Sequence, residues 1–383
     1  MTQHKKLQTG TDNQGGIIQM REVVKTFTNS AGEFTALRGV DLDLQRGEFA
    51  AVIGKSGSGK STLLNMLTGI DHPTSGQILV DGTDVHAMSE SKRSLWRGRN
   101  LGIVFQFFQL LPMLNLMENV MLPMDYVGKH AIEDRPKRAM EILARVGLEG
   151  EAQKLPNAVS LGQQQTAAIA RALATDAPIL VADEPTGNLD SRSAGKIIDL
   201  FEELSRQGKT IVMVTHDPTM TERANRTVFI SDGELVNETI AQALPLLTHP
   251  VMKELGRRVE PLQVRPGETI IEHKKPVENF YLIQQGKVDI VLTGRRRDDL
   301  VVSSLERNDF FGEIELLQGG KSIASVRAAE EGPVDLLVLS REDFRWLMDA
   351  SPLTENAMGK IVQKRLEERK SADRRKKKRG LFG

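Results

Sequence analysis

The chain contains no cysteine, and this absence excludes several kinds of chemistry. Disulfide bonds, thiolate metal sites and cysteine nucleophiles are ruled out, which also points away from redox chemistry. No apolar run approaches the roughly 20 residues needed to span a bilayer. The start of the sequence, with Lys5 and Lys6, lacks the apolar core of a signal peptide. We therefore expect a cytoplasmic protein.

The formal net charge of the chain is zero, but the charges are unevenly distributed along it. The 383 residues include 51 Lys and Arg and 51 Asp and Glu. The segment from Lys360 to Gly383 carries 11 basic against 3 acidic residues, a net charge of +8, so the remainder carries −8. A length of this size predicts two or three domains, and 39% hydrophobic residues suffice for a core in each.

Near the end of the chain, Arg374 to Arg379 are all positively charged, and Leu381 and Phe382 follow them. Such a block cannot pack, which predicts a mobile tail. A basic cluster beside an apolar tip suits an anionic membrane surface. Nucleic acid would attract it too, but without interleaved aromatics we expect no specific nucleic-acid partner. A solubilising tail without a partner is the alternative.

A glycine-rich stretch, Gly54 to Ser61, fits the pattern G-x-x-x-x-G-K-[ST]. It follows the apolar run Phe49 to Ile53 and precedes a helix-like segment, Thr62 to Leu67. A strand, a glycine turn and a helix N-terminus direct several N–H groups at one anion. Lys60 adds a charge at the phosphate oxygens and Ser61 a hydroxyl for Mg²⁺. The predicted nucleotide-binding residues are Gly54, Lys55, Ser56, Gly57, Ser58, Gly59, Lys60, Ser61 and Thr62. An ordinary Gly/Ser turn is the alternative.

Two carboxylates, Asp183 and Glu184, follow the apolar run Pro178 to Ala182. The run is typical of a fully buried parallel strand. At its carboxyl end, Asp183 can hold the Mg²⁺ that Ser61 also touches. Glu184 is placed to accept a proton from an attacking water. Adjacent acids are otherwise a solvated turn, but the glycine-rich stretch upstream favours the metal site.

Five further motifs lie in a fixed order around these two sites. They are Phe27, Val104-Phe105-Gln106, Val159 to Gln163, Asn188 to Asp190, and Thr215-His216-Asp217. With them, the chain from about Ile17 to Glu238 resembles the nucleotide-binding subunit of ABC transporters, in the branch of lipoprotein-release and macrolide-export ATPases. The resemblance implies an ATPase that uses ATP and Mg²⁺, dimerises through its nucleotide sites and drives a membrane permease.

The resemblance also implies a role for each motif. Phe27 stacks on adenine, and Gln106 meets Mg²⁺ or the attacking water. Three residues of the signature motif and one of the D-loop act at the dimer's nucleotides: Ser160, Gly162, Gln163 and Asp190. The signature departs from the family pattern, because Leu161 replaces a glycine and Thr166 stands where arginine is common. We expect these departures to affect the rate of ATP hydrolysis or the partner, rather than the existence of the site.

His216 and an apolar segment each have two interpretations. His216 follows the buried-strand pattern Thr210 to Val214, so that a neutral imidazole there can reach a γ-phosphate oxygen. A surface histidine is the alternative. The segment Leu110 to Leu114 is apolar and forms either a socket for a partner's helix or part of a helical-subdomain core.

The region between Glu238 and Lys360 follows a different pattern. Ala241 to Gly256 predicts short helices, and Glu342 to Asp349 predicts a closing helix. Between them, turns at Gly267, Gly286 and Gly312 separate strand-like runs, namely Phe280 to Ile283, Val288 to Leu292 and Leu336 to Leu339. Short strands at this spacing predict a sandwich or jelly roll.

From about Val251 to Ser351 this half resembles the cyclic-nucleotide-binding domain. The resemblance rests on Val264 to Glu268, Phe280 to Val288 and, above all, Phe311 to Leu317. It implies that Gly312 and Glu313 open a phosphate-binding cassette in which Glu313 accepts from a ribose hydroxyl. The family's phosphate-binding arginine would fall at Ser322, and Lys321 beside it lacks a guanidinium's paired donors. An altered ligand or a structural module is therefore favoured over a cyclic nucleotide.

Together these patterns predict a flexible segment 1–16, an α/β P-loop ATPase domain with a helical subdomain at 17–240, a β-roll at 241–352 and a basic helix with a disordered tail at 353–383. The expected function is ATP hydrolysis for a separately encoded permease, on the inner face of the membrane. A soluble, non-transport ABC ATPase is one alternative. A ligand-sensing module with a scaffold ATPase domain is the other.

Overall fold

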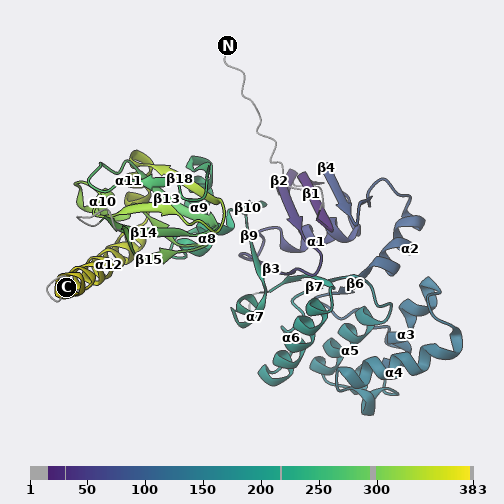
Figure 1. Ribbon diagram of the computed structural model, residues 1–383. Helices are drawn as coiled ribbons and strands as arrows, with labels where there is room; N and C mark the ends of the chain where they lie inside the picture. Colours follow the sequence, from purple (N-terminus) through teal and green to yellow (C-terminus); the bar gives the residue numbers. More distant parts are fainter. Residues whose placement is uncertain (1–15, 31, 216–217, 294–298, 380–383) are drawn as a thin grey trace. The chain divides into compact units, whose positions relative to one another are not determined.

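A computed structural model describes residues 16–30, 32–215, 218–293 and 299–379 (Figure 1). The chain divides into two compact units, with the boundary between Leu235 and Val236. Each unit has its own sheets and its own hydrophobic core.

The first unit is built on a six-stranded sheet whose inner strands are apolar along their whole length. The strand order is β10-β9-β3-β8-β7-β6. Its strands are β3 (Phe49–Ile53), β6 (Leu101–Val104), β7 (Ile179–Asp183), β8 (Thr210–Val214), β9 (Arg226–Ser231) and β10 (Glu234–Val236). The pairs β6–β7, β7–β8, β8–β3 and β3–β9 are parallel. Cores on both sides bury these strands, which explains their continuous apolar runs.

A second, four-stranded antiparallel sheet shares one of these cores. Its order is β2-β1-β4-β5. The strands are β1 (Ile18–Asn29), β2 (Gly32–Leu44), β4 (Ser75–Val80) and β5 (Thr83–Asp84). Leu37 of β2 and Ile78 of β4 pack in the same cluster as Leu63 of helix α1 (Lys60–Thr68) and Val52 of β3. Helix α1 is therefore held between the two sheets.

Helices α3, α4 and α5 gather into a subdomain with a core of its own (Figure 1). The helices of the first unit are α1, α2 (Glu90–Asn100), α3 (Leu116–Val127), α4 (Arg135–Arg145), α5 (Leu161–Leu173), α6 (Ser191–Arg206) and α7 (Pro218–Arg223), with 3-10 turns η1 (Ile132–Asp134), η2 (Glu149–Glu151) and η3 (Pro156–Ala158). Asn115 and Glu118 form a capping box that starts α3. The predicted α/β domain with a helical subdomain is confirmed.

The second unit is a β-roll of two four-stranded antiparallel sheets, β11-β18-β13-β16 and β12-β17-β14-β15. The strands are β11 (Glu260–Val264), β12 (Thr269–Ile271), β13 (Asn279–Gln285), β14 (Val288–Thr293), β15 (Asp299–Leu305), β16 (Phe310–Phe311), β17 (Ser325–Ala328) and β18 (Val334–Ser340). Its helices are α8 (Glu238–Ala243), α9 (His249–Arg258), α10 (Glu313–Gln318), α11 (Arg341–Ala350) and α12 (Pro352–Arg379). One core contains Ile283 and Leu336 of the first sheet and Val288 and Val326 of the second, as a sandwich requires.

The last described part of the chain forms one long helix. Helix α12 continues to Arg379, so the predicted basic helix includes the block Arg374 to Arg379, whose mobility stays a prediction. Lys, Arg and Glu are good helix formers. Buried Met358 and Val362 anchor the first half of α12, from which the helix propagates. Within the described ranges, no helix combines the length and the apolar character needed to cross a membrane.

Candidate functional site

The predicted site residues of the first unit lie at one edge of its parallel sheet. The register pairs Val52 with Val214, Val214 with Asp183, and Ala182 with Val104. The carboxyl ends of β3, β8, β7 and β6 therefore meet at the same edge, where α/β folds place their ligands. The glycine-rich loop, Glu184 and Gln106 follow three of these strands. His216 and Asp217 fall outside the described residues, so the histidine stays a prediction.

The glycine-rich loop closes tightly, and its glycines are required. A Cβ at Gly54 would lie 2.2 Å from the carbonyl oxygen of Ile230, and one at Gly59 would lie 2.6 Å from that of Ala36. Gly59, with φ of 104°, immediately precedes Lys60, the first residue of α1. The first N–H groups of a helix have no intrahelical partner, so this loop presents donors to an anion.

Lys60 is folded into the loop. Its side chain is 7% exposed, and Nζ donates to the carbonyl oxygens of Gly54, at 2.9 Å, and Lys55, at 2.8 Å. Burial lowers the pKa of Lys60, while the charges of Glu184 and Asp183 raise it. The ammonium group is thus held by neutral carbonyls at the point where a phosphate would offer charged oxygens.

Ser61 and Asp183 are in direct contact although 122 residues separate them. The Ser61 hydroxyl donates to Asp183 Oδ2 at 2.9 Å. A hydroxyl and a carboxylate oxygen side by side match the oxygen ligands that Mg²⁺ prefers. The structure therefore brings together two of the three predicted metal ligands. Gln106, the third, is exposed in the segment that follows β6.

Glu184 has a left-handed backbone, with φ of 49°. Few residues other than glycine adopt this region, so the conformation must be stabilised by its surroundings. The Glu184 N–H donates to the Val214 carbonyl at 3.0 Å, and the Glu184 carbonyl accepts from the Gly187 N–H at 3.2 Å. These bonds tie the residue to the neighbouring strand and to the following turn. The main chain that carries the Glu184 carboxylate is therefore fixed in position just beyond strand β7.

The signature segment starts helix α5. The Ser160 hydroxyl accepts from the Gln163 N–H at 3.2 Å, and Gln163 Oε1 accepts from the Ser160 N–H at 2.9 Å. This capping box is enough to explain why Ser160 and Gln163 occur here, even if neither contacts a ligand. A Cβ at Gly162 would lie 3.3 Å from the Asn188 carbonyl, so the first turn of α5 packs against the D-loop.

The two departures from the family signature are accommodated. Leu161 is 60% exposed, so its side chain does not fill the core. Thr166 donates its hydroxyl to the Gly162 carbonyl one turn earlier, at 2.9 Å. Neither residue strains the helix, which leaves the segment intact for contact with a second molecule.

Asp190 caps helix α6 in this structure. Its Oδ1 accepts from the N–H groups of Arg192 and Ser193, and Oδ2 accepts from the Ser193 hydroxyl at 2.7 Å. The hydrogen bond from the Ser193 hydroxyl contributes most to lowering the pKa of Asp190. The structure thus accounts for Asp190 as a helix cap, and its predicted nucleotide contact stays a prediction.

Phe27 lies on β1, where 40% of the residue is exposed. It faces Phe34 of β2 in the strand register, and Phe34 is 57% exposed. Lys25 Nζ lies 4.8 Å from the centre of the Phe27 ring. An exposed aromatic pair beside a cation suits the stacking of a base. Sequence reasoning missed Phe34, for which the alternation along a hairpin strand was the available signal.

Two side chains that the sequence did not reveal, one half-buried and one buried, hold the segment after Gln106. Arg171 of α5 donates to the carbonyl oxygens of Phe108, at 2.7 Å, and Gln109. Asn119 of α3 is fully buried and binds both the N–H and the carbonyl of Leu111. No motif marks either residue, because their partners are main-chain atoms.

The apolar segment Leu110 to Leu114 contributes to the helical core, and its role as a socket for a partner's helix stays a prediction. Leu110 packs against the helical core. Leu111 is 40% exposed and Met113 is 78% exposed, and nearby Phe107 is 76% exposed. The segment therefore contributes to the subdomain core and presents apolar side chains to solvent.

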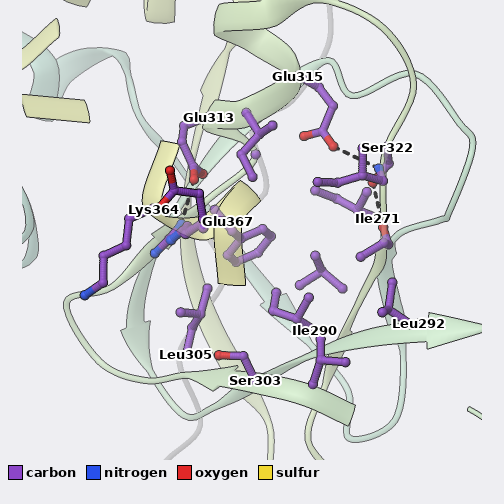
Figure 2. Close-up of a pocket in the computed structure, with 18 residues that line it drawn as sticks. Ile271, Ile290, Leu292, Ser303, Leu305, Glu313, Glu315, Ser322, Lys364 and Glu367 are labelled. Atoms are coloured by element: carbon purple, nitrogen blue, oxygen red, sulfur yellow. Dashed lines mark hydrogen bonds and ion pairs between the residues drawn. The ribbon is translucent and has the colours of Figure 1, made fainter. Parts of the chain in front are cut away.

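The second unit contains a cavity of about 810 Å³ (Figure 2). Gly312, Glu313 and Ser322, three of the four predicted ligand residues, line it. The Ser322 hydroxyl is buried and donates to the Ala324 carbonyl at 2.6 Å. Lys321 is exposed and does not line the cavity, because successive residues of an extended segment point to opposite sides.

A cation that the sequence did not reveal lies beside Glu313. Arg365 of α12 pairs with Glu313 at 2.7 Å between Nη1 and Oε1, although the sequence predicted no cation there. Glu313 is 1% exposed. Burial raises the pKa of Glu313, while Arg365 lowers it. The residues are 52 positions apart on different elements, and no sequence pattern links them.

Comparison with known proteins agrees with this division. A family model described as "ABC transporter" matches residues 37–187, and one described as "Cyclic nucleotide-binding domain" matches residues 261–351. The uncharacterized ABC transporter ATP-binding protein YknY of Bacillus subtilis is 41% identical over 228 residues, which cover 59% of this chain and 98% of that protein.

Longer proteins and solved structures also match. The macrolide export ATP-binding/permease protein MacB of Bradyrhizobium diazoefficiens is 44% identical over 58% of this chain and 34% of its own length. The dimeric ATP-binding cassette MJ0796, solved bound to ADP and phosphate, superposes with a TM-score of 0.55 at 40% identity, over 57% of this chain and 96% of that one. The chain belongs to the ATP-binding subunits of ABC transporters, as an ABC ATPase followed by a cyclic nucleotide-binding domain.

Proposed function

We propose that this chain is the ATP-hydrolysing subunit of a transporter whose permease is a separate protein. It works as a homodimer on the cytoplasmic face of the membrane, and its second unit is a regulatory module. The observation that carries the proposal is the contact between Ser61 and Asp183 beside buried Lys60, at the edge of the sheet where Glu184 begins its turn.

In this proposal each group has a task, and that of His216 comes from the family resemblance alone. Lys60 and the N–H groups at the start of α1 bind the phosphates of ATP. Ser61, Asp183 and Gln106 hold Mg²⁺, which when bound neutralises charge on the phosphate oxygens. Glu184 accepts a proton from the attacking water. His216 contacts the γ-phosphate, and Phe27 stacks on the base.

The dimer follows from the signature segment. In a head-to-tail pair, Ser160, Gly162 and Gln163 of each protomer face the nucleotide of the other, and the helix N-terminus adds N–H donors. Exposed Leu161 leaves that surface available to a second copy. The cassette MJ0796, solved as a dimer in two structures, supports the arrangement.

A separate permease is supported by how the relatives align. YknY, named an ATP-binding protein, is covered over 98% of its length, whereas MacB, named an ATP-binding/permease protein, is covered over 34%. The exposed apolar side chains of Phe107, Leu111 and Met113 supply a surface for that partner. Because Arg171 and Asn119 hold this loop, the surface is presented in a fixed shape.

Site-specific photocrosslinking tests this surface. A benzoylphenylalanine introduced at Met113 should crosslink to an integral membrane protein in membranes of the native host, identified by mass spectrometry. The matched control is the same substitution at Ile132, which is 72% exposed in η1. Crosslinks confined to soluble proteins, or equal crosslinking from both positions, would refute the permease surface and favour a non-transport ABC ATPase.

A further inference from the structure

The cavity of the second unit combines an apolar wall with an acidic corner (Figure 2). Ile271, Ile290, Leu292 and Leu305 line its apolar part. Glu313 forms the acidic corner beside α12, whereas Glu315 lies apart from it, beside Ser322 (Figure 2); they are 1% and 6% exposed. The volume of about 810 Å³ lies within the range of about 300–1,000 Å³ that small-molecule pockets have.

No described residue of the β-roll itself contributes a cation to the lining of this cavity. Among the described residues that line it, the basic ones are Lys364 and Arg365, and both come from α12. At the position where a phosphate would need a positive partner, Ser322 uses its hydroxyl on the Ala324 carbonyl. Glu315 accepts from the Ile323 N–H at 3.1 Å, which places a carboxylate beside the same segment. An anionic ligand would therefore meet carboxylates that repel it.

Arg365 occupies the acidic corner as a ligand would. Its guanidinium pairs with Glu313, donates to the Phe310 carbonyl at 2.8 Å and lies 5.1 Å from the centre of the Phe310 ring. A buried carboxylate requires such a partner, because an uncompensated charge in the interior is strongly unfavourable. A ligand with a positive charge and hydrogen-bond donors can therefore replace Arg365 without leaving the carboxylate of Glu313 uncompensated.

We propose that this cavity binds a small organic cation with an apolar body, whose amine or guanidinium replaces Arg365 on Glu313 and thereby releases α12. The apolar body fills the space between Ile271, Ile290 and Leu305. Arg365 is then an internal competitor, so the ligand's apparent affinity reports both its own contacts and the cost of freeing α12. The inference concerns the second unit alone and is independent of the transport proposal.

Titration calorimetry on the full-length protein tests the ligand class. The probes are 4-phenylbutylguanidine, its neutral analogue 4-phenylbutanol, its anionic analogue 4-phenylbutanoate, and cyclic AMP. We expect the guanidine to bind at least about tenfold more tightly than the alcohol, since one charge-assisted hydrogen bond contributes that much. The butanoate should not bind, and cyclic AMP should bind no more tightly than ~100 μM.

Two variants test the competition. Arg365→Gln should tighten binding of the guanidine by at least about tenfold, because the internal competitor is gone. The matched control is Lys360→Gln, which removes a charge from an exposed position of α12 that does not line the cavity and should leave the affinity unchanged. Glu313→Gln should abolish the preference for guanidine over alcohol, while cyclic AMP binding stays weak.

Hydrogen–deuterium exchange of residues 352–367 provides a readout that does not depend on affinity. The guanidine should raise exchange in this half of α12, and Arg365→Gln should raise it without any probe. Equal binding of guanidine and alcohol, micromolar binding of cyclic AMP, or no tightening in Arg365→Gln would each overturn the proposal. None of these measurements involves ATP, so their failure leaves the ATPase and permease proposal untouched.

Discussion

At the scale of single residues, Lys60 and Glu184 are positioned by main-chain bonds rather than by each other. Lys60 is held by two carbonyl oxygens of its own loop, and Glu184 by the Val214 carbonyl and the Gly187 N–H. A substitution of Glu184 should therefore change chemistry without disturbing its main-chain bonds, whereas a substitution of Lys60 also removes the two bonds of its ammonium group to the loop. The two residues also act at different steps, which makes their variants distinguishable.

Glu184→Gln should retain ATP binding and lose turnover by a factor of ~10² or more, because glutamine cannot accept the proton of the attacking water. The side chain keeps its size, so the left-handed backbone at 184 is unaffected. Turnover by the purified variant and its dimerisation with ATP, followed by analytical ultracentrifugation, measure the effect. Turnover at the parental rate would refute the role of Glu184.

Lys60→Ala is the contrasting variant. It removes the charge from the phosphate loop, so ATP affinity itself should fall. Calorimetric titration with ATP measures the difference, and equal affinity of variant and parent would contradict the phosphate cradle.

The residues that the sequence revealed and those that it did not differ in the kind of partner they have. Ser61 and Asp183 were predicted because each belongs to a motif whose spacing reflects its own chemistry, and the structure places them 2.9 Å apart. Arg365, Arg171 and Asn119 bind a distant carboxylate or main-chain atoms. Such partners have no sequence signature, since any residue supplies a carbonyl.

At the scale of elements, Arg171 connects helix α5 with the loop between β6 and α3. The signature starts α5, and the loop begins just after Gln106. Burial lowers the pKa of Arg171, yet its guanidinium still donates to two carbonyls. These bonds therefore tie the signature helix directly to the exposed apolar loop.

Arg171→Ala should loosen this loop, because two main-chain carbonyls lose their donor at a cost of about 1–3 kcal/mol. Hydrogen–deuterium exchange of residues 105–114 should rise accordingly. Arg145→Ala is the control: Arg145 pairs with Glu203 at the surface, where such pairs contribute about 0–1 kcal/mol. Unchanged exchange in the Arg171 variant would show that Asn119 alone holds the loop.

The elements themselves were largely predictable from the sequence. The runs Phe49 to Ile53 and Thr210 to Val214 coincide with β3 and β8, because buried parallel strands are continuously apolar. The extent of the C-terminal helix was not predictable from charge repulsion, which leaves out the helix propensity of Lys and Arg and the packing of the first half of α12.

At the scale of the whole molecule, opposite charges are separated along the chain. The segment from Lys360 to Gly383 carries +8 and the remainder −8. A basic end on a chain whose other part is acidic can bind an anionic surface while the acidic part is repelled. The motifs predicted the ABC transporter family and the cyclic nucleotide-binding domain. The charge pattern alone does not identify which anionic surface the basic end binds.

Deleting Ser371 to Gly383 tests whether that surface is lipid. The parent should co-sediment with phosphatidylserine vesicles in a salt-dependent manner, because a Debye length of ~8 Å at physiological ionic strength screens such contacts. The truncated chain should bind less, with no salt dependence. Unchanged sedimentation would indicate a solubilising end, and equally strong binding to nucleic acid would indicate nonspecific polyelectrolyte attraction.

Helix α12 carries Arg365 in its first half and the basic block in its last turns. The truncation at Ser371 therefore leaves the pair between Arg365 and Glu313 complete. A protease that cuts after Lys370 would do the same, producing a shorter protein that keeps Arg365 on Glu313. The basic end of the chain can thus change without a change at the cavity, although one helix contains both.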